Sequence, residues 1–334
     1  MHFAVYLPLV VPVLAALAAR PLADRLPPAA ATWLLAASAI VLALASSAVL
    51  GMLALSALVR IPVIDAVAHL SGPVIRSGDA VSVPVAIVAG GLLAMATVAA
   101  GRAVWRRGRA IAAAHRHASS LPGVGQVVVT EDTAADAYTL PGWPCRIVIT
   151  QGMLRALSPG EQGVLLAHER SHARGSHYLF TSAARLAAAA NPLLRPVAAQ
   201  TGYTVERWAD ERAATQAGDR TLAARAIARA ALATSAAPPG RDAAMTALGL
   251  ITQEGEHRAG VHPGDQPRVD QPRVDLHKAG QVPRRVAALL APRPRLRLLL
   301  LAAAIVLVAI SGTAALEAAR NFHQLIELAQ SPHA

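Results

Sequence analysis

The chain has 334 residues, 54% of them hydrophobic and only 15% charged, with a net charge of +11. A soluble globular protein carries about 25% charged residues, so this composition indicates membrane spans. The basic balance would suit nucleic acid, but much of the positive charge lies beside apolar runs, where lipid headgroups account for it. We therefore expect membrane lipids as partners and no direct nucleic-acid contact. Cys145 is the only cysteine, which excludes an intrachain disulfide and a Cys-rich metal cluster.

Four apolar stretches are long enough to cross a bilayer, which takes about 20 helical residues. They are residues 3–19, 33–59, 81–104 and 298–316. The first could also be a signal peptide, but its basic residues follow the apolar run instead of preceding it. We therefore expect an uncleaved span and a multi-pass protein of the cell membrane.

Arginines cluster on three flanks of these spans, at Arg20–Arg25, Arg102–Arg109 and Arg284–Arg297. With four spans, all three flanks fall on one side, which the positive-inside rule assigns to the cytoplasm. The expected organisation is a membrane region over residues 1–104, a cytoplasmic domain over 105–254, a basic tether over 255–297, the fourth span, and an extracytoplasmic tail over 317–334.

Strand patterns open the cytoplasmic domain at residues 126–130 and 146–150, the second after a Pro- and Gly-rich turn. Helical patterns follow, with residues 221–237 the plainest. The run 178–190 is apolar but too short to span, so we expect a core helix or one on the membrane surface. The stretch 255–280 is polar and repeats DQPRV, which favours a flexible tether.

A metal-binding pattern lies in the middle of this domain. Ser158-Pro159-Gly160-Glu161 predicts the start of a helix, with Glu161 completing a capping box. His168-Glu169-Arg170-Ser171-His172 follows on the same helix. Positions i and i+4 share a face, so both imidazoles can bind one zinc ion, while Glu169 can take a proton from the attacking water.

A second pair of side chains could complete the site. Glu206 and Asp210 are again four residues apart and share a helix face. One carboxylate can bind zinc while the other accepts a hydrogen bond from the far nitrogen of a ligand histidine. Such a pair is otherwise common on helix surfaces, and only the HExxH motif upstream gives it weight.

Together, these strands, the turn, the capped HERSH helix and the ERWAD run resemble the BlaR/MecR-type membrane metallopeptidases, and also the CAAX prenyl proteases and heat-shock membrane proteases. The resemblance covers roughly residues 127–213. It implies that His168, His172 and Glu206 bind one zinc per chain, that Glu169 is the general base, and that Asp210 supports a ligand. It also implies that Ala137, Tyr138, Thr139 and Leu140 form an edge strand along which a substrate peptide lies.

The sequence also departs from these families. Ser176-His177 replaces an acid that many relatives carry. We also expect no penicillin-sensing domain after the fourth span, and therefore no sensing of β-lactams. His177 could stabilise the oxyanion or simply cap the motif helix, and Tyr203 is a weaker oxyanion candidate.

The sequence therefore predicts an α+β zincin-like metallopeptidase domain inserted in a membrane scaffold of about four transmembrane helices. The expected activity is hydrolysis of a peptide bond in a cytoplasmic or membrane-associated protein, for which the families suggest a transcriptional repressor. The alternatives are a catalytically inactive scaffold or signalling protein that keeps the zincin fold, and a DNA-associated membrane regulator suggested only by charge.

Overall fold

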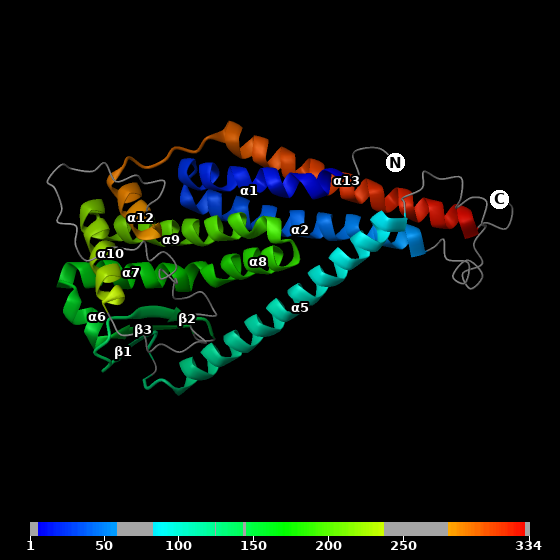
Figure 1. Cartoon of the computed structure of the whole chain (residues 1–334). Helices are drawn as coiled ribbons and strands as arrows, with labels where there is room; N and C mark the ends of the chain where they lie inside the picture. Colours follow the sequence, from blue (N-terminus) through cyan, green and yellow to red (C-terminus); the bar gives the residue numbers. More distant parts are fainter. Residues whose placement is uncertain (1–5, 59–82, 124, 143–144, 237–279, 331–334) are drawn as a thin grey trace, which may run out of the picture.

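The computed structural model describes residues 6–58, 83–123, 125–142, 145–236 and 280–330. The described part is mainly helical and carries a small three-stranded sheet (Figure 1). The helices are α1 (Leu7–Arg25), α2 (Pro28–Leu58), α5 (Val83–Ser120), α6 (Gln151–Ala156), α7 (Pro159–Gly175), α8 (His177–Ala190), α9 (Arg195–Ala217), α10 (Arg220–Ser235), α12 (Gln281–Leu290) and α13 (Leu298–Gln330), with the 3-10 turn η2 at Pro192–Leu194.

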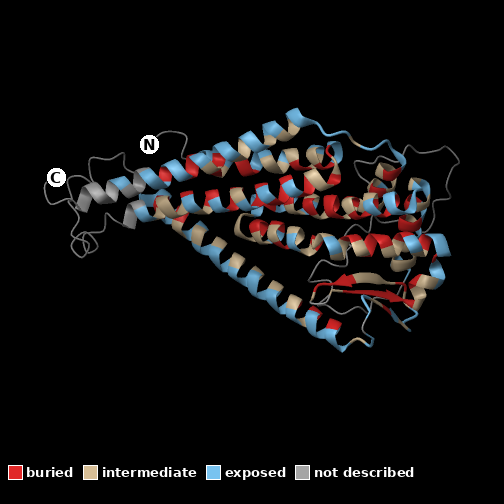
Figure 2. Ribbon diagram, turned by 180° about the vertical axis from the view of Figure 1, so that it is seen from behind, coloured by how far each residue is buried: buried red, intermediate tan, exposed pale blue. Residues whose placement is uncertain are grey.

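Four helices are long and apolar enough to cross a membrane: α1, most of α2, α5 and the first part of α13. They overlap the four predicted spans, and each continues beyond its apolar run. Much of the surface of α5 and α13 is exposed (Figure 2). Its large side chains are apolar: Ile87 on α5 is 69% exposed and Leu299 on α13 is 87% exposed. Extended uncovered apolar surface of this kind suits contact with lipid, and it suggests a membrane protein.

The sheet has the strand order β1-β3-β2. Strand β3 (Arg146–Thr150) is central, with β1 (Val127–Thr130) parallel to it and β2 (Ala137–Leu140) antiparallel. The two β-branched runs predicted as strands are β1 and β3. One face of the sheet packs on the end of α5, and the other packs on α6, α7 and α10. Strand β2 lies at one edge of the sheet, next to α7.

Helices α8 and α9 form a hairpin beside α1 and α2 (Figure 1). Their shared core joins Val11 of α1 and Leu42 of α2 to Leu194 and Val197 of the hairpin. At the turn, Asn191 Nδ2 donates to Ser46 Oγ at 3.1 Å. The apolar run 178–190 is therefore a core helix, α8, and the hairpin packs α9 against α1 and α2.

The prediction of a flexible tether over residues 255–297 is wrong for its last part, which contains a helix. Residues 281–290 form helix α12, which packs on α9 and α10, whereas residues 255–279 lie outside the described part of the chain. The apolar side chains Val282, Val286 and Leu289 recur at helical spacing and join the cluster between α7, α9 and α10. Burial of this stripe makes α12 a packed element instead of a flexible linker.

Candidate metal centre

Helix α7 carries the two histidines of the motif, and its start is fixed as predicted. The Ser158 backbone N–H donates to the Glu161 carboxylate at 2.9 Å, and Pro159 occupies the first helical position. One full turn apart, the His168 and His172 rings turn to the same side, and their Nε2 atoms lie 3.0 Å apart. The capped helix thus presents two imidazole nitrogens to one point.

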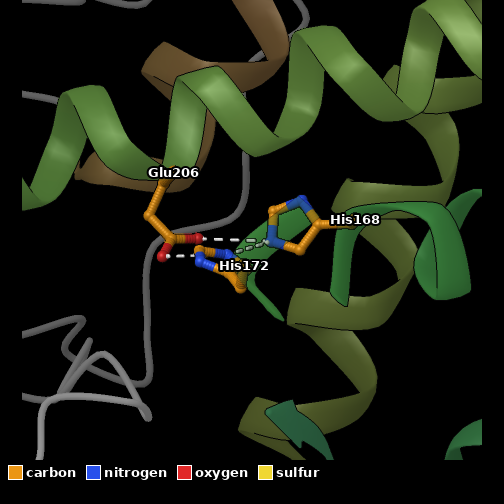
Figure 3. Close-up of side chains that lie close together, drawn as sticks. All are labelled: His168, His172 and Glu206. Atoms are coloured by element: carbon orange, nitrogen blue, oxygen red, sulfur yellow. Dashed lines mark hydrogen bonds and ion pairs between the residues drawn. The ribbon is translucent and has the colours of Figure 1, made fainter. Parts of the chain in front are cut away.

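Helix α9 brings Glu206 to the same point (Figure 3). Its carboxylate oxygens lie 3.5 Å from His168 Nε2 and 3.6 Å from His172 Nε2. The three side chains form a group whose possible ligand atoms all lie within 4.8 Å of one another. Of the two carboxylates that the sequence left open, Glu206 is the one that faces both rings.

The spacing and charge of this group fit a zinc ion. Ligand atoms about 2.0–2.1 Å from tetrahedral zinc lie about 3.3–3.4 Å apart, and the observed separations of 3.0–3.6 Å bracket that value. Although burial lowers the pKa of His168, the Asp210 and Glu206 carboxylates outweigh it and raise that pKa to about 10. Carboxylates that stabilise a proton on this imidazole also favour binding of a metal cation at the same place.

Each histidine has a partner at its far nitrogen. Asp210 Oδ1 lies 3.0 Å from His168 Nδ1, and His177 Nδ1 lies 3.1 Å from His172 Nδ1. Partners of this kind fix the tautomer and orientation of a metal-binding imidazole. His177 is 1% exposed and stands behind His172, on the side away from Glu206, which favours an orienting role over oxyanion stabilisation. Gly175 leaves room for it, because a Cβ there would collide with the His177 ring.

Tyr203, the weaker oxyanion candidate, points elsewhere. Its side chain is buried in the core shared with α1 and α2, and the Arg284 guanidinium lies 4.0 Å from the centre of its ring. The structure therefore places Tyr203 on the side of α9 that packs on α1 and α2, outside the group formed by His168, His172 and Glu206.

Glu169 lies beside this group and contacts strand β2. The Thr139 hydroxyl lies 2.8 Å from Glu169 Oε2 and 3.0 Å from the Glu169 carbonyl oxygen, so its single proton can serve one acceptor at a time. Burial raises the pKa of the Glu169 carboxyl, and His168 and Thr139 offset part of that rise. A buried carboxyl with a raised pKa suits a group that must accept and return a proton.

Arg285 on α12 was not predicted as part of the site. Its guanidinium donates to both oxygens of Asp210 at 2.8 Å, and its Nη1 lies 3.2 Å from Glu206 Oε2. In the sequence, this arginine belongs to the basic flank before the fourth predicted span. The signal that could have found it is the apolar spacing of α12, which places Arg285 on the same face as Val282 and Leu289.

Comparison with known proteins identifies one family. The model of peptidase family M48 matches residues 102–237, a range that holds α7, α9 and all three converging side chains. No curated protein and no solved structure matches the chain. Together with the His-His-Glu group, the match supports an M48 family metallopeptidase.

Proposed function

We propose that the protein is a membrane-bound zinc endopeptidase that hydrolyses a peptide bond in a cytoplasmic or membrane-associated protein. The observation that carries the proposal is the convergence of His168, His172 and Glu206 with the buried carboxyl of Glu169 beside them. Convergent ligands next to a positioned base form the working parts of a metal-assisted hydrolase.

In this proposal the three converging side chains hold one zinc per chain, which would supply a Lewis acid that polarises a peptide carbonyl and acidifies water. Glu169 accepts the proton from the attacking water and returns it to the leaving amine. Asp210 and His177 keep the two ligand rings in one orientation. Thr139 holds the Glu169 carboxylate in place.

The substrate in this proposal is an extended peptide that pairs with the edge strand β2. Because Thr139 of β2 contacts Glu169, a peptide added to this edge would run past the general base. A cytoplasmic transcriptional repressor is the substrate that the likeness to BlaR/MecR-type proteins suggests, and a misfolded or lipid-modified membrane protein is the alternative.

Removal of the metal tests the activity directly. We expect the purified full-length protein to contain about one zinc per chain, as a three-ligand catalytic site requires. It should cleave an unfolded protein substrate, lose that cleavage on treatment with a chelator, and regain it when zinc is restored. A protein that binds zinc yet cleaves no substrate in a broad peptide library would favour the inactive-scaffold alternative.

The catalytic domain is proposed to face the cytoplasm. Arg207 of α9 donates to the Ala23 carbonyl near the end of α1 at 2.6 Å, and Arg284 of α12 contacts Asp24. The domain therefore sits at the same end of α1 as its basic flank, which the positive-inside rule assigns to the cytoplasm.

Topology reporters test this orientation. Reporter fusions at Ser120 and at the C-terminus should report opposite sides of the membrane, because α13 separates them. Matching readings from the two fusions would show that the number of membrane crossings is wrong. A Ser120 fusion that reports the outside would reverse the proposed orientation.

A further inference from the structure

Arg285 is a buried cation in contact with the metal group, although it lies outside the residues matched to the peptidase family. It is 8% exposed and comes from α12, the last helix before α13. One guanidinium contacts two carboxylates of α9, Asp210 through two hydrogen bonds and Glu206 at 3.2 Å. The site is therefore built from two separate parts of the chain.

The carboxylates need such a partner. Glu206 and Asp210 lie one helical turn apart on the same face of α9, and like charges at this spacing repel. Burial strengthens that repulsion because the surroundings screen it less than water does. A guanidinium suits the position because its planar fork can pair with one carboxylate while a remaining N–H points to the other.

Helix α12 is held firmly enough to position this arginine. Arg220 donates to the carbonyl oxygens of Leu289 at 2.8 Å and Ala288 at 3.1 Å, at the end of α12. On another side, Arg284 Nη2 donates to Asp24 of α1 at 2.8 Å. Neighbouring arginines on α12 thus have different partners. Arg284 pairs with Asp24 of α1, and Arg285 pairs with Glu206 and Asp210 in the site.

We infer that Arg285 is a positioning residue of the zinc site, which neutralises and orients Glu206 and Asp210 so that the ligand group is preformed before the metal binds. The inference rests on the proposed zinc site. In the zinc-free protein the guanidinium pairs with both carboxylates, which the His168 imidazole also contacts. When zinc is present, the ion shares that task, so the protein depends on Arg285 less.

Thermal unfolding of the full-length protein, with zinc and with chelator, tests this difference. We expect Arg285→Gln to lower the unfolding temperature of the zinc-free protein by on the order of 5–10 °C more than that of the zinc-loaded protein. The zinc-dependent gain in unfolding temperature should therefore be larger in this variant than in the wild type. Arg284→Gln is the matched control: it also weakens α12 docking, but should lower both states equally and leave the gain unchanged.

If Arg285→Gln lowers the unfolding temperature of the zinc-free and zinc-loaded proteins equally, the inference is overturned and Arg285 is an ordinary packing residue. If that variant can be purified only in the presence of zinc, the expected result has appeared in its extreme form. If it cannot be purified at all, Arg285→Lys takes its place, since lysine keeps the charge without the planar guanidinium. The zinc-dependent gain in unfolding temperature of Arg285→Lys should exceed that of the wild type, by less than is expected for Arg285→Gln. A lysine variant with the wild-type gain and reduced stability in both states would contradict the inference. Absence of any zinc-dependent gain in the wild type would instead overturn the proposed function, and this inference with it.

Discussion

Replacement of Glu169 by Gln should leave zinc in place and reduce turnover by about 10²–10⁴-fold, the usual contribution of a general base. The amide keeps the size of the side chain and can still accept a hydrogen bond from Thr139, which lies 2.8 Å from the present carboxylate. It cannot take a proton from water. Glu169 is moreover not one of the three side chains that converge as ligands, so the metal group stays complete.

Zinc content and cleavage of any accepted peptide, measured on the same preparation, check this expectation. Thr139→Ser is a useful companion because it keeps the hydroxyl, and it should retain most of the activity. Loss of zinc from Glu169→Gln would mean that this carboxylate is a ligand. Unchanged turnover with zinc bound would mean that another group accepts the proton.

Replacement of one of the three converging side chains should instead remove the zinc, and activity should be lost for that reason. We expect His172→Ala and Glu206→Gln to lose most of the bound zinc, because each removes one of only three protein ligands. For Glu206→Gln the reason is that a neutral amide is a poor zinc ligand beside two neutral imidazoles. Activity should fall with the metal content, and high zinc concentrations should restore part of it.

Metal analysis of the two variants beside the wild type decides the ligand assignment. Glu211→Gln is the matched control for Glu206→Gln, since Glu211 is on the same helix but forms ion pairs with Arg220 and Arg293. That control should keep its zinc. Stoichiometric zinc in Glu206→Gln would send the search for the third ligand to Asp210, which already lies 3.0 Å from the far side of His168.

Local patterns in the sequence were enough to predict the parts of the site that come from single helices. The spacing of His168 and His172, and that of Glu206 and Asp210, translates directly into shared helix faces. The capping residues before α7 and the β-branched strands are equally local. The choice of Glu206 over Asp210 as the residue facing both rings needed the packing of α9 on α7.

Contacts between distant segments could not be predicted in the same way. Arg285 lies 75 residues after Asp210 in the chain, and no local pattern relates them. The position of His177 behind His172 depends on the sharp break between α7 and α8, where Ser176 adopts a left-handed conformation with φ of 47°. A flank rich in arginine also has an ordinary explanation at a membrane surface, which concealed the role of Arg285 in the site.

The origin of Arg285 in α12 also bears on how the enzyme is made. During synthesis, α7 and α9 leave the ribosome well before α12, and α13 follows α12 directly. A growing chain that ends after α10 already contains the histidines and both carboxylates but lacks their guanidinium. Completion of the proposed centre therefore coincides with synthesis of the segment that leads into α13, so a chain that ends earlier would lack this contact with Glu206 and Asp210. For the same reason, a fragment cut at the end of the matched region would leave the buried Asp210 and the partly buried Glu206 without Arg285.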